Sequence, residues 1–134
     1  MNRDINKQNA CEILTAMEGG DHDSIIARLT DDARFWAPIS ATKRGISRPV
    51  SGAREIASLF TRARHFENMH WAVEQCLAEG DWVTVHTHMQ GTLKNGNHYD
   101  NWHLWLFRFD GERVAEAWEY ADTAYAVEVM SSAT

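Results

Sequence analysis

The chain has 134 residues, a length that suits a single hydrophobic core, and we expect one domain over residues 1–134. Its formal charge of −6 argues against a nucleic-acid surface and against binding to an anionic membrane. Residues 1–10 hold no apolar leader and no apolar run is long enough to cross a membrane, so we expect a cytoplasmic protein. The two cysteines lack CxxC spacing, which favours free thiols over a disulfide framework or a zinc knuckle.

Two helices are predicted at the start of the chain. Residues 5–17 carry apolar side chains at helical spacing, and Gly19-Gly20 ends this helix. A short second helix is expected over residues 23–29, with Asp21 or Asp23 as its N-cap.

The chain then changes from extended structure to a third helix. Residues 31–38 are expected to be extended and to end at Pro38. Residues 39–52 are rich in Gly, Ser and Thr, which predicts a loop or a poorly paired edge. The third helix is expected over residues 53–66, with Ser51 as its N-cap.

Residues 70–122 have the pattern of an antiparallel meander. Turn sequences at Gly80-Asp81, Asn95-Gly96 and Asp110-Gly111 divide them into four strands. Three helices followed by this meander predict an α+β fold, in which a strongly curved, mostly antiparallel sheet wraps over the helices. The six tryptophans favour a large apolar interior or an aromatic-lined pocket on the concave face.

Five segments in this order resemble the nuclear-transport-factor-2-like superfamily, and its SnoaL-like domains in particular. They are AMEGGDHDSIIARLTDDARFWAP, SGAREIASLF, AEGDWVTV, LFRFDGERVAEAW and EYADTAYA. The superfamily includes ketosteroid isomerases, limonene epoxide hydrolases, scytalone dehydratases and SnoaL-like polyketide cyclases. The resemblance implies a cone-shaped fold with an internal pocket, a homodimer joined through the sheet, and no cofactor.

The catalytic positions of these enzymes are only partly matched. The base, the oxyanion tyrosine and the second acid of ketosteroid isomerases fall on Ala37, Ile13 and Trp105, so that arrangement is missing. The Arg-x-Asp pair of limonene epoxide hydrolases falls on Trp82 and Thr84. Their final Asp, which the resemblance also assigns as the base of SnoaL-like cyclases, is matched by Asp122 in EYAD.

The hairpin around Asn95-Gly96 predicts which side chains share a face. A two-residue type I′ turn would place His88 opposite His103 and His86 opposite Trp105. The same parity, carried across the next turn without a bulge, turns Tyr120 and Asp122 toward the same inner face.

These positions predict an acid–base pocket for an apolar, ring-bearing small molecule. We expect Asp122 to be the general base and His103 its proton-shuttle partner, with Tyr120, Asn101 and Gln90 as possible donors to a developing oxyanion. The reaction would be a cyclisation, isomerisation, dehydration or hydrolysis. The residues expected to bind the substrate are Trp36, Phe60, Trp82, His86, His88, Asn101, Trp105 and Trp118.

Other interpretations of the same residues stay open. The histidines could be structural, or His86, His88 and His103 could form a three-imidazole metal site. The domain could instead be a non-catalytic binding module for a hydrophobic small molecule or a partner peptide. Trp102, Leu104 and Leu106 are expected on the outer face, where a sheet-to-sheet dimer would bury them.

Overall fold

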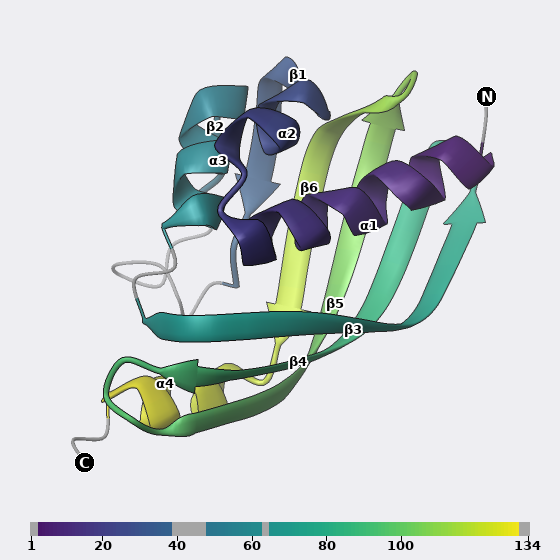
Figure 1. The fold of residues 1–134 in the computed structure, drawn as a ribbon. Coiled ribbons are helices and arrows are strands. Elements are labelled where there is room, and N and C mark those ends of the chain that lie inside the picture. Colours follow the sequence, from purple (N-terminus) through teal and green to yellow (C-terminus); the bar gives the residue numbers. More distant parts are fainter. Residues whose placement is uncertain (1–2, 39–47, 63–64, 132–134) are drawn as a thin grey trace.

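The computed structural model describes residues 3–38, 48–62 and 65–131. The elements are α1 (Arg3–Gly19), α2 (His22–Ala27), β1 (Leu29–Trp36), β2 (Val50–Ser51), α3 (Ala53–Thr61), β3 (Phe66–Glu79), β4 (Trp82–Leu93), β5 (His98–Asp110), β6 (Arg113–Ala121) and α4 (Thr123–Ser131). The six strands form one sheet in the order β2-β1-β6-β5-β4-β3 (Figure 1). The predicted α+β fold, with three N-terminal helices and a mostly antiparallel sheet, is therefore confirmed.

One feature of the sheet, the parallel pairing of β1, and one helix, α4, were not predicted. β1 pairs with β6 in parallel, while the other strand pairs are antiparallel. The C-terminal helix α4 lies at the far end of the sheet from α2 and α3 (Figure 1). Residues 39–52 were expected to be a loop or a poorly paired edge; residues 39–47 lie outside the described part of the chain, and Val50–Ser51 form a two-residue edge strand paired with β1, which agrees with the second alternative.

The ends of the helices follow from local capping. α1 ends at Gly19, and Gly20 takes a positive φ of 66° that glycine adopts without strain. Asp21 caps α2, because its side chain accepts a hydrogen bond of 3.1 Å from the Ser24 backbone N–H. The expected N-cap of α3 is wrong by one residue: the cap is Gly52, at a φ of 98°, and not Ser51.

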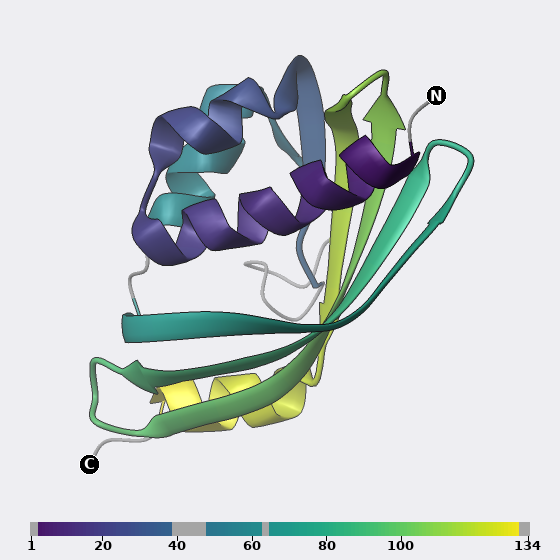
Figure 2. The same ribbon diagram turned by 45° about the vertical axis from the view of Figure 1, so that its right-hand side comes forward.

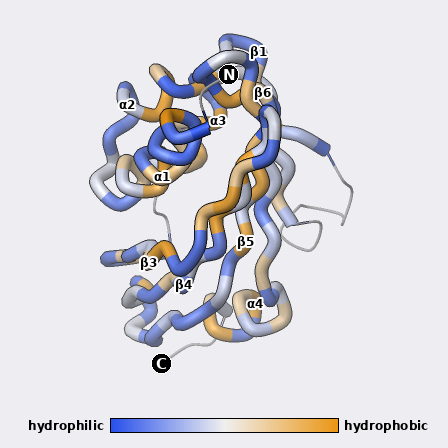
Figure 3. Tube along the Cα trace, turned by 90° about the vertical axis from the view of Figure 1, so that its right-hand side faces the viewer, coloured by the Kyte–Doolittle hydropathy of each residue, from blue (hydrophilic) through white to orange (hydrophobic). Residues whose placement is uncertain are grey.

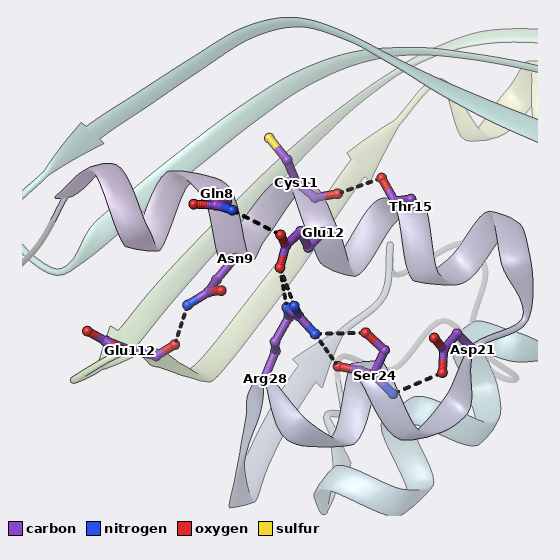
Figure 4. A network of polar contacts seen from close by, with 9 residues as sticks. All are labelled: Gln8, Asn9, Cys11, Glu12, Thr15, Asp21, Ser24, Arg28 and Glu112. Carbon is purple, nitrogen blue, oxygen red and sulfur yellow. Dashed lines mark hydrogen bonds and ion pairs between the residues drawn. The ribbon is translucent and has the colours of Figure 1, made fainter.

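Arg28 links the first two helices. Its Nε donates to the Glu12 carboxylate of α1 over 2.9 Å, and its Nη1 donates to the Ser24 carbonyl of α2 over 2.9 Å (Figure 4). Asn9 of α1 donates in turn to the Glu112 carbonyl over 3.0 Å, at the turn between β5 and β6. These contacts hold α1 across the sheet, so its apolar side faces the strands.

The helices α1 to α3 cover the concave face of the curved sheet (Figure 2). Hydrophobic residues occur on the helices and along the strands that enclose the core (Figure 3), and those of α3, β5 and β6 that are buried include Ile56, Phe60, Trp105, Phe107 and Val114. Trp105 lies at the centre with no exposed surface, and its ring lies 5.7 Å from Phe60, 6.0 Å from Phe35 and 5.6 Å from Trp71 between centroids. Each such pair adds about 0.5–1.5 kcal/mol beyond burial.

The register of the β4–β5 hairpin differs from the prediction by one residue. His103 lies opposite Thr87, and His88 lies opposite Trp102. Gly96 takes a φ of 93° and the Leu93 N–H donates to the Asn97 carbonyl, which makes a three-residue loop in place of the expected type I′ turn. Because side chains alternate with a period of two, this single residue moves the β4 side chains to the opposite face.

A bulge changes the parity of β6. Arg108 pairs with Glu116, whereas Phe109 pairs with Val114, so β6 holds one more residue than β5 at this step. Beyond the bulge, Ala117 and Glu119 face inward, and the side chains expected there face outward.

None of the helices in the described ranges is long and apolar enough to span a membrane.

Candidate active site

A cavity of about 620 Å³ lies between the concave face of the sheet, α1, α3 and α4. Its wall is mostly apolar, and aromatic rings make up much of it. The aromatic side chains are Phe35, Phe60, Phe66, Trp71, Tyr99, His103 and Trp105. A cavity of this size and lining suits a small organic molecule with an apolar body.

A chain of polar side chains runs along one wall. His103 Nδ1 lies 2.8 Å from Glu119 Oε2, and His103 Nε2 lies 2.9 Å from the Tyr99 hydroxyl. Asn101 Nδ2 donates to the same hydroxyl oxygen over 2.8 Å. All four residues come from the inner faces of β5 and β6.

The strands explain why these groups meet. Tyr99, Asn101 and His103 alternate on one face of β5, since successive inward side chains are two residues apart. His103 lies opposite Ala121 in β6, so Glu119 is its diagonal neighbour on the same face. Trp71 of β3 closes the site, with its ring perpendicular to the His103 ring at 5.0 Å.

The hydrogen bonds fix the protonation pattern of a neutral His103. The Tyr99 hydroxyl oxygen accepts from Asn101, so its proton is available to His103 Nε2, and the Nδ1–H of His103 then donates to Glu119. Burial raises the pKa of Tyr99 to about 12, with the Asn101 hydrogen bond opposing and the nearby Glu119 charge adding to the rise. Tyr99 is therefore a neutral phenol over the physiological range.

Glu119 is the member of this chain with the greatest access to the cavity. Its side chain is 18 % exposed and lines the cavity, whereas His103 is 10 % exposed at its side chain. Oε2 is hydrogen-bonded to His103, and Oε1 has no hydrogen-bond partner among the described residues. Both ring nitrogens of His103 already have partners.

Some of the expected pocket residues line this cavity. They are Phe60, His103 and Trp105. Asn101 is buried on the inner face but does not line the cavity. Its Nδ2 donates to the Tyr99 hydroxyl and, over 3.1 Å, to the Asp122 carbonyl.

The expected inward position of Asp122 is wrong. The residue is exposed, and its Oδ1 accepts a hydrogen bond of 3.1 Å from the Tyr125 backbone N–H, so it caps α4. Tyr120 is 54 % exposed on the outer face, and Trp118 is half-buried there, because the β6 bulge reverses their direction. Trp36 is half-buried and lies on the side of β1 opposite the buried Phe35.

The expected inward positions of three β4 residues are wrong as well. Trp82, His86 and His88 lie on the outer face, which follows from the hairpin register. His86 and His88 stack on Trp102 with ring centroids 5.0 Å and 4.4 Å away, and His88 also contacts Asp100.

A three-imidazole metal site is therefore not formed by these residues. His103 faces the cavity while His86 and His88 face the other way, so the three rings cannot share an ion. Within the described ranges, no group of three or more His, Cys, Asp or Glu side chains is arranged to hold a metal ion.

Sequence reasoning missed the roles of Tyr99 and Glu119. The alternation along β5 could have revealed Tyr99, because it shares parity with Asn101 and His103. Glu119 was hidden by the bulge, for which the sequence between the Asp110-Gly111 turn and Glu119 carries no glycine signal.

Comparisons with known proteins agree with this fold. Solved structures that resemble the chain include an NTF2-like protein of unknown function from Burkholderia pseudomallei K96243, with a TM-score of 0.85, 21% identity, and 98% and 100% of the two chains covered. TerC, crystallised with polyporic acid, has a TM-score of 0.83 and 17% identity, with 96% and 99% covered. An LEH-like epoxide hydrolase from M. tuberculosis has a TM-score of 0.74 and 18% identity, with 96% and 90% covered.

These identities are low, so the three structures show a shared fold and no more. A search of curated protein sequences finds no significant match. The family model described as the SnoaL-like domain matches residues 11–117, which is most of the chain. The chain therefore belongs to the SnoaL-like domain family.

Proposed function

We propose that the protein is a cofactor-independent acid–base enzyme that removes a proton from a carbon acid, with Glu119 as the general base. The observation that carries this proposal is the hydrogen-bonded chain from Glu119 through His103 to Tyr99, on the wall of an apolar cavity. Proton abstraction next to a carbonyl is the first step that cyclisation, isomerisation and dehydration have in common.

Glu119 is favoured over His103 as the base because of access. Its Oε1 has no partner among the described residues, whereas both nitrogens of His103 are engaged. His103 acts as a positioning residue, since its Nδ1–H holds the carboxylate in one orientation toward the cavity. Tyr99 and Asn101 hold the imidazole in turn.

The apolar wall supports this chemistry in two ways. It binds a ring-bearing substrate by burying apolar surface. It also replaces part of the water around the carboxylate, whose side chain is 18 % exposed. The crystallisation of TerC with polyporic acid is consistent with a small organic ligand in this fold.

The proposal is tested with 2-tetralone, an apolar bicyclic ketone with exchangeable protons beside its carbonyl. The protein in D₂O should accelerate deuterium incorporation, followed by mass spectrometry. Glu119→Gln keeps the size and the hydrogen-bonding shape of the side chain but removes the base, and should lower the rate by ~10²- to 10⁴-fold. His103→Gln should lower it by a smaller factor, because the carboxylate remains.

Circular dichroism of each variant establishes that it is folded. Binding of 2-tetralone without any acceleration of exchange by the wild-type protein would contradict the enzyme proposal, and would favour a binding module for hydrophobic small molecules.

A further inference from the structure

The cavity is lined by two basic side chains, an arginine and a histidine, that the proposed proton transfer does not use. Arg62 follows the last residue of α3, and His65 precedes the first residue of β3; both are exposed and both line the cavity. Because each is exposed and also lines the cavity, both lie where the cavity meets solvent, a position called the rim below.

One backbone hydrogen bond ties each of these two residues to the rest of the fold. The Arg62 backbone N–H donates to the Ser58 carbonyl over 3.1 Å at the end of α3. The His65 carbonyl accepts from the Lys94 N–H over 2.8 Å, which joins the rim to the β4–β5 loop. Backbone contacts on the rest of the fold therefore position both Arg62 and His65.

The charges at the cavity are unequal between rim and interior. Among the described residues that line it, Glu119 is the sole carboxylate, and it is paired with His103. The Arg62 guanidinium forms no ion pair with a described residue. Positive charge at the opening of a pocket stands out in a protein of formal charge −6.

We propose that the ligand of this cavity is a ring-bearing organic anion whose acidic group stays at the rim with Arg62 and His65 while its rings enter the aromatic interior. This inference rests on the proposed function, because it names the substrate class of the same site. The arrangement separates the two charges of the complex: the anionic group of the ligand remains near water, and its carbon acid lies close to Glu119.

A cationic rim has two physical consequences for such a ligand. It attracts an organic anion that the net negative charge of the protein would otherwise repel. It also fixes the orientation of the rings, because an acid buried next to Glu119 would meet a like charge. Specificity for the anion follows from the first effect, and the orientation of its rings follows from the second.

The test compares two probes of the same shape, 2-naphthoate and 2-naphthamide, by isothermal titration calorimetry. We expect 2-naphthoate to bind about fivefold more tightly at low salt, the range of an exposed ion pair, and to lose this advantage near 1 M salt. Arg62→Gln should abolish the preference. Arg54→Gln is the matched control, because Arg54 is an exposed residue of the same helix that does not line the cavity.

Equal affinities for the two probes, or a preference that survives in Arg62→Gln, would overturn the inference. The result is separable from that of the exchange assay. Glu119→Gln should keep the preference for 2-naphthoate while losing exchange on 2-tetralone. If the wild type exchanges 2-tetralone but shows no preference for the anion, the substrate class is wrong and the base is not.

Discussion

Glu119 and Asp122 are three residues apart, yet their carboxylates have different surroundings. Glu119 is largely buried, lines the cavity and contacts His103. Asp122 is exposed and satisfies a backbone N–H at the start of α4. A capping carboxylate already stabilises a helix end, and moving it to a substrate would break that contact. The two environments favour chemistry at Glu119 and structure at Asp122.

Tyr99 leads to a prediction about alkaline stability. Its pKa is raised to about 12, chiefly by burial, while an unfolded tyrosine titrates near ~10. Between these pH values the unfolded chain releases this proton and the folded chain keeps it. The free energy of unfolding should therefore fall by about 2–3 kcal/mol as the pH rises from about 10 to about 12, and the contribution is fully present below about 10.

Urea denaturation at pH 9 and above pH 11 measures this loss. Tyr99→Phe should remove that part of the alkaline decline, whereas Tyr120→Phe, at the exposed tyrosine of the outer face, should leave it unchanged. Cys76, whose pKa burial raises to about 11, contributes equally in both variants. An identical decline in wild type and Tyr99→Phe would show that Tyr99 titrates normally.

At the scale of elements, the order of helices and strands could be predicted from the sequence, but the register between strands could not. Hydrophobic periodicity and turn residues placed α1 to α3 and β3 to β6, because amphipathic patterns are set by local spacing. Two local features, each involving one additional residue, then determine which side chains face the cavity. They are the three-residue loop at Gly96 and the bulge before Glu116. Neither changes the local hydrophobic pattern, but the loop reverses the faces of the β4 side chains and the bulge reverses those of the later β6 side chains.

The residues of the site show the same division. His103, Phe60 and Trp105 could be predicted to line a pocket, since their faces depend on β5 and α3 alone. The inward face of Glu119 depends on the bulge, which involves contacts between two strands. The resemblance of the chain to its superfamily favoured Asp122 instead of Glu119. A matched residue type does not show which face of the sheet the side chain occupies.

Gly91 lies in β4 opposite Met69 of β3, where the two strands pack closely. A Cβ added there would lie 2.3 Å from the Asn68 carbonyl oxygen, and backbone atoms cannot yield as a flexible side chain can. Gly91→Ala should therefore cost about 1–3 kcal/mol and lower the Tm by several degrees. Gly19→Ala, where nothing lies within 4 Å, is the control. Unchanged thermal melting of Gly91→Ala would mean that β3 and β4 are less closely spaced than described.

At the scale of the whole molecule, the outer face of the sheet is unusually apolar. Trp102 is 50% exposed and Leu104 is 41% exposed, and the two are successive outer-face residues of β5. We expect a homodimer in which this face packs against that of a second copy, since large exposed apolar patches mark interfaces. Leu104→Lys should dissociate it, and Gln8→Lys on the helical side should not. Sedimentation velocity at micromolar concentration checks both, and a monomeric wild type would contradict the expectation.

The identity of the catalytic base is tested most directly by one pair of variants. Deuterium exchange into 2-tetralone is measured for Glu119→Gln and Asp122→Asn, with both proteins confirmed as folded. We predict a loss of ~10²- to 10⁴-fold for Glu119→Gln and a rate within about threefold of wild type for Asp122→Asn. A large loss for Asp122→Asn together with near-normal exchange by Glu119→Gln would contradict this prediction.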